Sequence, residues 1–306
     1  MAGEIQIGGT TFATESGGTV TVSNVDSATN RTNLGLGSMA TQNANAVALT
    51  GGSITGTTIV PTTPFSFRNR IINGNLSNPI NQRGAASITA STGYTYDRWY
   101  YDGSTYLYQG IEDKNVNNGT YVISWEGSGI NAAWKVSTDT TAGNGPDATT
   151  GFTSVSNGGT FTVNEGTEYS KHLWIRFDGT LANLDKVMVE EGTVATPFEH
   201  RPYGLELSLA QRYYFQVGGS SGFLIGGYMN SGDDYNSPFP FPAVMRSTPV
   251  ASVTGTWGSS NVSTTKPQVL RITNLSATIY ATVSGAGSWY FDANTSDDLI
   301  KFDAEL

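Results

Sequence analysis

Aromatic residues set among Gly, Asn, Ser and Asp are the feature of this sequence that most suggests chemistry. The main segment of this kind spans residues 226–236 and contains Tyr228, Asn230, Asp233, Asp234, Tyr235 and Asn236. Two shorter segments of the same character surround Trp257 and Trp289. Such a mixture offers flat apolar faces for sugar rings together with adaptable hydrogen bonding. We predict that these residues contact a receptor; the alternative is that the segments are ordinary hairpin loops whose aromatic side chains lie in the core.

The sequence contains few residues that could catalyse hydrolysis. His172 and His200 are the only histidines, and there is no cysteine for a thiolate site or a disulfide. Carboxylates occur as sequence neighbours, and neighbouring residues of a strand point to opposite faces, whereas a glycoside hydrolase needs two facing carboxylates. Carboxylates from different strands could still converge. The sequence favours a protein that is not an enzyme, binds no metal and needs no cofactor.

The charge balance restricts the partners. The chain has a net charge of −9, with 16 basic and 25 acidic residues, so a nucleic-acid partner is not expected. Charged residues make up only 13% of the sequence, and the 37 glycines favour an all-β architecture with many tight turns. Residues 1–10 lack the basic start and apolar core of a signal peptide, so we expect synthesis in the cytoplasm.

The first 60 residues cannot build an ordinary core, because they contain a single aromatic residue, Phe12, and no Trp or Tyr occurs before Tyr94. Their aliphatic residues nevertheless alternate at strand spacing, as in Ile5/Ile7, Val20/Val22 and Val47/Leu49. Short strands of this kind bury one face only against neighbouring chains. We therefore predict a β-rich oligomeric stem over residues 1–64, which ends at the stiff segment Pro61–Pro64; the alternative is a disordered leader.

The rest of the chain predicts two β domains, over residues 65–203 and 204–306. Short strands separated by turn signals are typical of a sandwich or jelly roll. The strands predicted in the first domain are 70–72, 99–101, 106–108, 121–125, 133–136, 160–163, 172–177 and 186–190. One helix is predicted over residues 205–213, before the strands of the second domain. Within the first domain, we interpret Asp97–Arg98–Trp99 as a core tryptophan with a structural Asp–Arg pair rather than as a sugar site.

Several strings resemble the tail fibres of tailed bacteriophages. VMVEEGTVATPFEHRPYGLELSLAQRYY (187–214) resembles the segment that closes their β-sandwich and leads into the distal domain. NRIINGNLSNPINQRG (69–84) and TYDRWYYDG (95–103) resemble the start of their carbohydrate-binding-module-like jelly roll. Further similar strings are LGLGSMATQNANAVALTGGSITG (34–56) of the fibre shafts, and FPFPAVMRSTPV (239–250) and KFDAEL (301–306) of the tip domains.

This resemblance implies a homotrimer in the virion tail. Its N-terminal region would attach to other tail proteins and form a short shaft, and its C-terminal β-sandwich tip would bind a host surface glycan or outer-membrane receptor. Two other classes remain open. One is a depolymerase that trims capsular polysaccharide, and the other is a passive structural fibre of a collar or head decoration.

We predict that the full-length protein is a trimer whose N-terminal region depends on assembly, because its strand-spaced aliphatic residues have no aromatic core of their own. Light scattering on the intact protein should give three times the chain mass. A monomeric mass together with an ordered N-terminal region would rule out the interchain stem.

Overall fold

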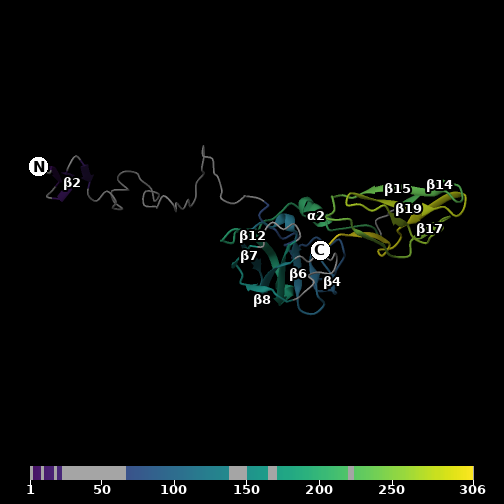
Figure 1. Ribbon diagram of the computed structural model, residues 1–306, viewed down its shortest axis with the longest axis horizontal. Helices are drawn as coiled ribbons and strands as arrows, with labels where there is room; N and C mark the ends of the chain where they lie inside the picture. The colour runs from purple at the N-terminus through teal and green to yellow at the C-terminus, as the bar shows by residue number, and fades with distance from the viewer. Residues whose placement is uncertain are drawn as a thin grey trace. The chain divides into compact units, whose positions relative to one another are not determined.

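The computed structural model describes residues 3–7, 10–16, 19–22, 67–137, 150–164, 171–219 and 224–305. This part of the chain is built almost entirely of antiparallel strands in several sheets, which confirms the predicted all-β sandwich class (Figure 1). The shaft string at 34–56 and the stiff segment Pro61–Pro64 lie outside the described residues. No helix among the described residues is long and apolar enough to cross a membrane.

The beginning of the chain forms a small antiparallel sheet of order β1-β2-β3. Its strands are β1 (Gly3–Ile7), β2 (Thr10–Ser16) and β3 (Thr19–Val22). The alternating pairs Ile5/Ile7 and Val20/Val22 therefore lie in strands, whereas Val47/Leu49 lies outside the described residues. Residues Met1–Val60 and Pro61–Leu306 are separate compact units, and the trimeric association of the first unit stays a prediction.

The central part of the chain is a sandwich of two antiparallel sheets. The three-stranded sheet has the order β10-β7-β12, and the six-stranded sheet has the order β4-β5-β6-β11-β8-β9. Their strands are β4 (Gly93–Tyr94), β5 (Tyr100–Tyr101), β6 (Leu107–Ile111), β7 (Gly119–Glu126), β8 (Ile130–Ser137), β9 (Thr153–Val155), β10 (Thr160–Val163), β11 (His172–Gly179) and β12 (Asp185–Glu191). Two short 3-10 helices, Asp113–Asn115 and Leu181–Asn183, connect strands.

Large side chains from both sheets fill the space between them. Trp99 lies against Phe177 with 6.0 Å between ring centroids, and Trp125 meets the same ring edge-on at 5.7 Å. Leu107 and Ile111 of β6 point into this core, whereas Tyr108 between them points to the other side. Tyr108 and Trp174 are buried there in a smaller aromatic cluster, so neither ring presents a face to solvent.

Seven of the eight strands predicted in this domain occur, with ends that differ by a few residues. The prediction was wrong for residues 70–72, which form no strand. Their backbone amides find other partners: Arg70 N donates to the Val189 carbonyl at 2.7 Å, and Ile72 N donates to Gln109 Oε1 at 2.8 Å. The Asn69 side chain accepts a bond from Ile71 N at 2.9 Å. Side-chain amides here replace the regular ladder of a sheet.

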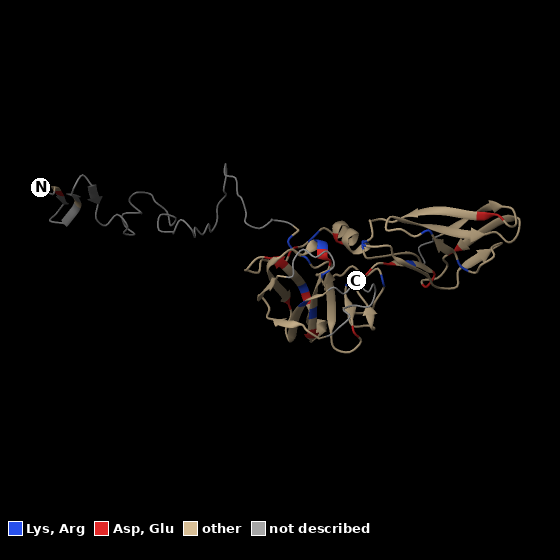
Figure 2. Ribbon diagram, in the orientation of Figure 1, with Lys and Arg blue, Asp and Glu red and all other residues tan. Residues whose placement is uncertain are grey.

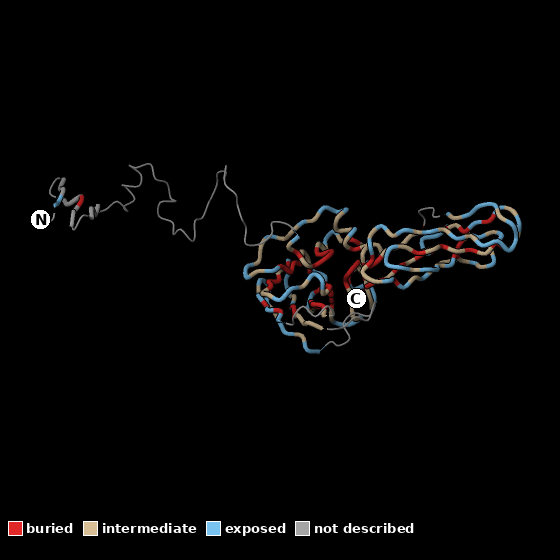
Figure 3. Tube along the Cα trace, turned by 45° about the horizontal axis from the view of Figure 1, so that its top comes forward, coloured by how far each residue is buried: buried red, intermediate tan, exposed pale blue. Residues whose placement is uncertain are grey.

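The C-terminal part is a second sandwich, built from three three-stranded sheets: β13-β21-β16, β14-β20-β17 and β15-β19-β18. The strands are β13 (Tyr214–Gly218), β14 (Leu224–Met229), β15 (Asp234–Pro240), β16 (Val250–Val253), β17 (Gly258–Ser260), β18 (Gln268–Leu270), β19 (Ser276–Thr282), β20 (Gly287–Asp292) and β21 (Leu299–Asp303). Alternate residues of β19 and β20 are buried in a core around Trp289, Phe291 and Phe302 (Figure 3).

Helix α2 (Tyr203–Gln211) connects the two sandwiches and begins two residues before the predicted 205–213. Ala210 and Tyr213 pack against Ile72 and Ile80 of the central domain in a third small cluster. The two large cores themselves divide between residues 71–189 and 245–304. This division follows the predicted ranges 65–203 and 204–306, whose boundaries stay a prediction.

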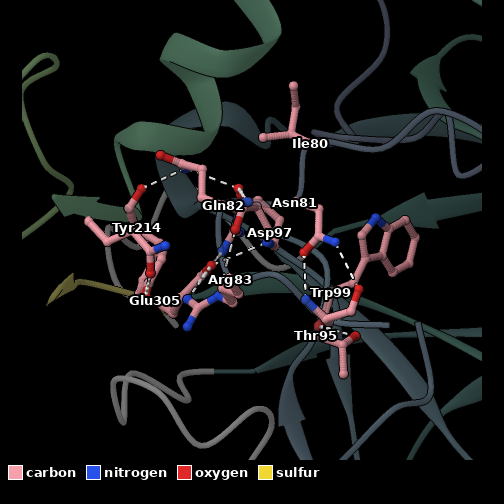
Figure 4. Close-up of polar contacts among 12 residues, drawn as sticks. Ile80, Asn81, Gln82, Arg83, Thr95, Asp97, Trp99, Tyr214 and Glu305 are labelled. Atoms are coloured by element: carbon pink, nitrogen blue, oxygen red, sulfur yellow. Dashed lines mark hydrogen bonds and ion pairs between the residues drawn. The ribbon is translucent and has the colours of Figure 1, made fainter. Parts of the chain in front are cut away.

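A buried ionic cluster also ties the end of the chain to the central domain. It consists of Arg83, Asp97, Arg98, Asp303 and Glu305, and we call it the Glu305 cluster. Arg98 pairs with Glu305, and both side chains are fully buried. Arg83 contacts Glu305 at 3.3 Å, Asp303 at 3.1 Å and Asp97 at 3.8 Å (Figure 4). Burial raises the pKa of Asp97 to about 6, partly offset by its hydrogen bonds from Gln82.

The strings that resemble phage fibres supply much of this cluster and its supports. Gln82 donates to Asp97 Oδ2 at 3.0 Å and to the Tyr214 carbonyl at 3.0 Å (Figure 4). The Asn73 side chain donates to the carbonyl of Asp97, and Trp99 Nε1 donates to the carbonyl of Asn73. For Asp97–Arg98–Trp99, the predicted core position of Trp99 is confirmed, but the predicted pair between Asp97 and Arg98 is wrong. Asp97 pairs with Arg83 and not with its neighbour Arg98, which turns to Glu305.

We predict that Arg98→Met lowers the free energy of unfolding by about 3–5 kcal/mol, because it leaves the Glu305 carboxylate buried without its main partner. Chemical denaturation would measure the loss. Arg212→Met is the control: Arg212 pairs with the buried Glu112, but it is partly exposed and Tyr213 also donates to that carboxylate. Arg98→Met/Glu305→Gln should recover part of the loss. Equal stability of the Arg98 and Arg212 variants would contradict the prediction.

Candidate functional site

The predicted receptor segment at 226–236 is not a single loop: it consists of the end of one strand, a turn and the start of another strand, and the two strands lie in different sheets. Strand β14 ends at Met229, residues 230–233 turn, and β15 begins at Asp234. The turn is tied to the neighbouring turn around Ser284: Gly232 N donates to the Val283 carbonyl at 2.7 Å, and Ser231 Oγ donates to the Ser284 carbonyl at 2.9 Å. This end of the sandwich is therefore held by hydrogen bonds between its turns.

Strands β14 and β15 belong to different sheets and do not pair with each other, so the predicted residues do not form one cluster. Tyr228 points outward from the β14-β20-β17 sheet, while Asp234 and Asn236 point outward from the β15-β19-β18 sheet. Tyr235 faces inward and contacts the Trp289 ring, with 4.7 Å between centroids. Asn230 and Asp233 are exposed at the turn between the layers, where Asp233 Oδ2 accepts a bond from Asn230 N.

The predicted exposure of Trp257 and Trp289 was wrong. Trp257 is 3% exposed and Trp289 is 1% exposed, and both belong to the C-terminal core. The indole nitrogen of Trp257 donates to the Thr254 carbonyl at 2.7 Å. A buried ring offers no face on which a sugar can stack, so these two residues support the sheet from below. The alternative stated for these segments, that their aromatic residues lie in the core, is correct for both tryptophans.

The exposed aromatic residues gather on the outer face of the β14-β20-β17 sheet. Tyr228 is 81% exposed, and Tyr290, which the sequence analysis missed, is 41% exposed. Tyr228 lies across from Ser288, and Tyr290 lies across from Gly226, so the two tyrosines are diagonal neighbours on adjacent strands. Leu224 is exposed on the same face. We call Leu224, Tyr228 and Tyr290 the tyrosine face.

Glycine keeps one flank of Tyr290 open. A Cβ atom at Gly226 would meet the Trp289 carbonyl oxygen at 2.5 Å and the Tyr290 Cβ at 2.9 Å, so a side chain there would displace the strand or the ring. On the opposite strand, Ser260 pairs with Tyr290 and adds only a small hydroxyl side chain. The Tyr290 ring therefore lies between two short neighbours, which gives a shallow surface suited to a flat ligand.

The outer face of the β14-β20-β17 sheet carries one charged residue, Asp292, which lies across from Leu224 at the end of β20. Its other strands, β14 and β17, carry no charged residue, and the neighbouring β15 of the other sheet carries only Asp234, at its start (Figure 2). Asp234 Oδ1 accepts bonds from Tyr280 and Thr282, both at 2.8 Å, and these bonds lower the pKa of this carboxyl. It lies on the outer face of the other layer, so its charge does not face the two tyrosines.

The buried residues Glu112, Glu190 and His172 make structural contacts. Glu112 accepts bonds from Arg212 and Tyr213, and Glu190 accepts bonds from Thr196. His172 is buried, its Nδ1 accepts a bond from Asp113 N, and burial lowers its pKa. No group of three His, Asp or Glu side chains within the described ranges is placed to hold a metal ion. The prediction that the protein is not an enzyme stays untested.

Comparison with known proteins gives no family. No family model matches the chain, and no curated protein matches it. Among solved structures, recombinant discoidin II of Dictyostelium discoideum is 10% identical, and the match covers 78% of this chain and 93% of that chain. Its TM-score of 0.18 is too low for the two backbones to share one arrangement, so this match carries no argument about fold or function. The resemblance to phage tail fibres therefore stays a prediction.

We predict that replacing a buried tryptophan by alanine destabilises the protein strongly, whereas replacing an exposed tyrosine by alanine does not. Trp289→Ala should destabilise the protein by about 3–5 kcal/mol, because it opens a cavity in the C-terminal core. Tyr228→Ala should change stability by less than about 0.5 kcal/mol, because its ring is solvated. Thermal or chemical unfolding of both variants measures this. A large loss for Tyr228→Ala would show that its ring is packed and unavailable to a ligand.

Proposed function

We propose that this protein is a tail-fibre adhesin of a tailed bacteriophage, which binds a host surface glycan without cleaving it. The observation that carries the proposal is the tyrosine face: Tyr228 and Tyr290 lie exposed side by side on a sheet with little charge. Aromatic rings of this kind offer apolar platforms with a polar hydroxyl tip. The phage context rests on the strings at 69–84, 95–103 and 187–214.

In this proposal the parts of the chain have separate tasks. The N-terminal region attaches to other virion tail proteins and assembles three chains, the central jelly roll supports the tip, and the C-terminal sandwich contacts the glycan. A shallow sheet face gives weak contacts singly. Three copies in each fibre and several fibres in each virion raise the effective concentration of the second and later contacts, so weak sites suffice for attachment.

The test uses the full-length protein on an array of bacterial capsules and lipopolysaccharides. Tyr228→Ala and Tyr290→Ala should each weaken glycan binding by about tenfold or more, equivalent to about 1.4 kcal/mol, while folding is unchanged. Tyr203→Ala is the matched control, because Tyr203 is also an exposed tyrosine but lies on α2. Unchanged binding by both sheet variants would exclude the tyrosine face.

The same samples distinguish an adhesin from the two other classes, a depolymerase and a passive structural fibre. After prolonged incubation the glycans should keep their length, because the carboxylates described above are held by structural donors. A ladder of shortened oligosaccharides would favour a depolymerase. Failure of the wild-type protein to bind any host cell or glycan would favour a passive structural fibre.

A further inference from the structure

The central sandwich carries an open groove that the proposed function does not use. The groove lies where the turn between β7 and β8 and the turn after β9 approach the end of β11, and it has a volume of about 630 Å³. This volume is within the range of about 300–1,000 Å³ that is typical of small-molecule sites. Its walls combine apolar, amide, hydroxyl and carboxylate groups from four strands and their turns.

The backbone around the groove is firmly held. The Asn157 side chain donates to the Trp125 carbonyl at 2.8 Å and accepts from Trp125 N at 3.1 Å, so the turn after β9 is bonded to the end of β7. Gly127 has a positive φ of 112°, and a Cβ there would collide with the Asn183 carbonyl. The Thr180 amide donates to the Gly129 carbonyl at 2.8 Å. The groove is thus preformed, which reduces the entropy cost of binding.

Apolar side chains line part of the groove. Trp125 is 8% exposed, and its ring is supported edge-on by Phe177 at 5.7 Å. Its indole nitrogen donates no hydrogen bond to any described residue, and it is not among the buried polar atoms that lack a partner. Ile130 and Val155 flank it and are half-buried. These groups offer a small apolar surface to the less polar face of a ligand ring.

Unused polar groups surround this apolar part. Asp178 Oδ1 accepts a bond of 2.6 Å from the Asn131 side chain, which orients the carboxylate, while Oδ2 has no partner in the described part of the chain. The hydroxyls of Ser154 and Ser156 line the groove and likewise make no hydrogen bond to the described residues. An oriented carboxylate oxygen accepts bonds from ligand hydroxyls, and serine hydroxyls both donate and accept.

The negative charge of the groove determines which ligands it can bind. Among the residues that the structure describes, Asp178 is the one charged residue that lines it, and no Lys or Arg of this part lines it to balance an anion. A carboxylated, sulfated or phosphorylated ligand would therefore be repelled. We propose that this groove is a second saccharide site, which takes a neutral oligosaccharide through hydroxyl bonds to Asp178 and contact with the apolar side of Trp125. The site is separate from the tyrosine face, so it does not depend on the phage assignment.

The test titrates the full-length protein with neutral trisaccharides, namely cellotriose, maltotriose and triacetylchitotriose, and with the anionic trisaccharide sialyllactose, by calorimetry and ligand-observed NMR. At least one neutral trisaccharide should bind, and sialyllactose should bind at least tenfold more weakly. Asp178→Asn should weaken neutral binding about tenfold, because the amide loses the charged acceptor. Ser156→Tyr, at an exposed position, should block the groove. Glu126→Gln is the control, since this exposed carboxylate pairs with Lys186 outside the lining.

The Tyr228→Ala/Tyr290→Ala double variant distinguishes the two sites. It should keep the trisaccharide affinity of the groove while losing binding to the bacterial glycans. Loss of trisaccharide binding in this double variant would overturn the groove proposal and leave the tyrosine face in place. The groove proposal is also overturned if none of the neutral trisaccharides binds, if sialyllactose binds as tightly, or if Asp178→Asn and Ser156→Tyr bind as the wild type does.

Discussion

The buried pair of Arg98 and Glu305 is the contact on which the arrangement of the larger unit depends. Arg98 belongs to the central domain and Glu305 lies at the end of the chain, so the pair joins residues 207 positions apart. The guanidinium also lies 3.5 Å from the centroid of Tyr213, and that of Arg83 lies 3.6 Å from the centroid of Tyr214. Two arginines thus bind the carboxylates of Asp303 and Glu305, at the end of the last strand and after it, and the aromatic residues that follow α2.

Buried ion pairs of this kind define a conformation more reliably than they stabilise it. Removing two charges from water costs several kcal/mol, and only accurate geometry with further hydrogen bonds compensates for that cost. Here the compensation comes from the central domain: Gln82 donates to Asp97, and Arg98 donates to the Gly110 carbonyl. A shifted register of β21 would leave Glu305 buried without a cation. In a chain with no cysteine, this requirement sets the position of the last strand, and with it the packing of the C-terminal core.

Period-two alternation predicted most strands but not which layer each strand joins. It failed at 70–72, where side chains of Asn69 and Gln109 replace a partner strand. It also failed to predict which residues of 226–236 point outward, because Gly226 and Gly227 have no side chain to show which face is buried. The sequence shows no apolar/polar alternation at 289–291 either, because Trp289, Tyr290 and Phe291 are all aromatic. The register assigns Trp289 and Phe291 to the core and Tyr290 to the surface.

The division between buried and exposed aromatic residues decides where this protein can bind. A ring that is buried in a core cannot also bind a ligand, so Trp257 and Trp289 are excluded as binding residues. Trp289 holds β20, and Tyr290 follows on the opposite face of that strand. Trp125 is 8% exposed: most of its ring lies in the core, where Phe177 meets it edge-on, and only a small part borders the groove. An exposed aromatic side chain that is held in place by a packed core loses little conformational entropy when a ligand binds. Two such weak sites on one chain, repeated in an oligomer, would gain avidity from effective concentration without any large interface.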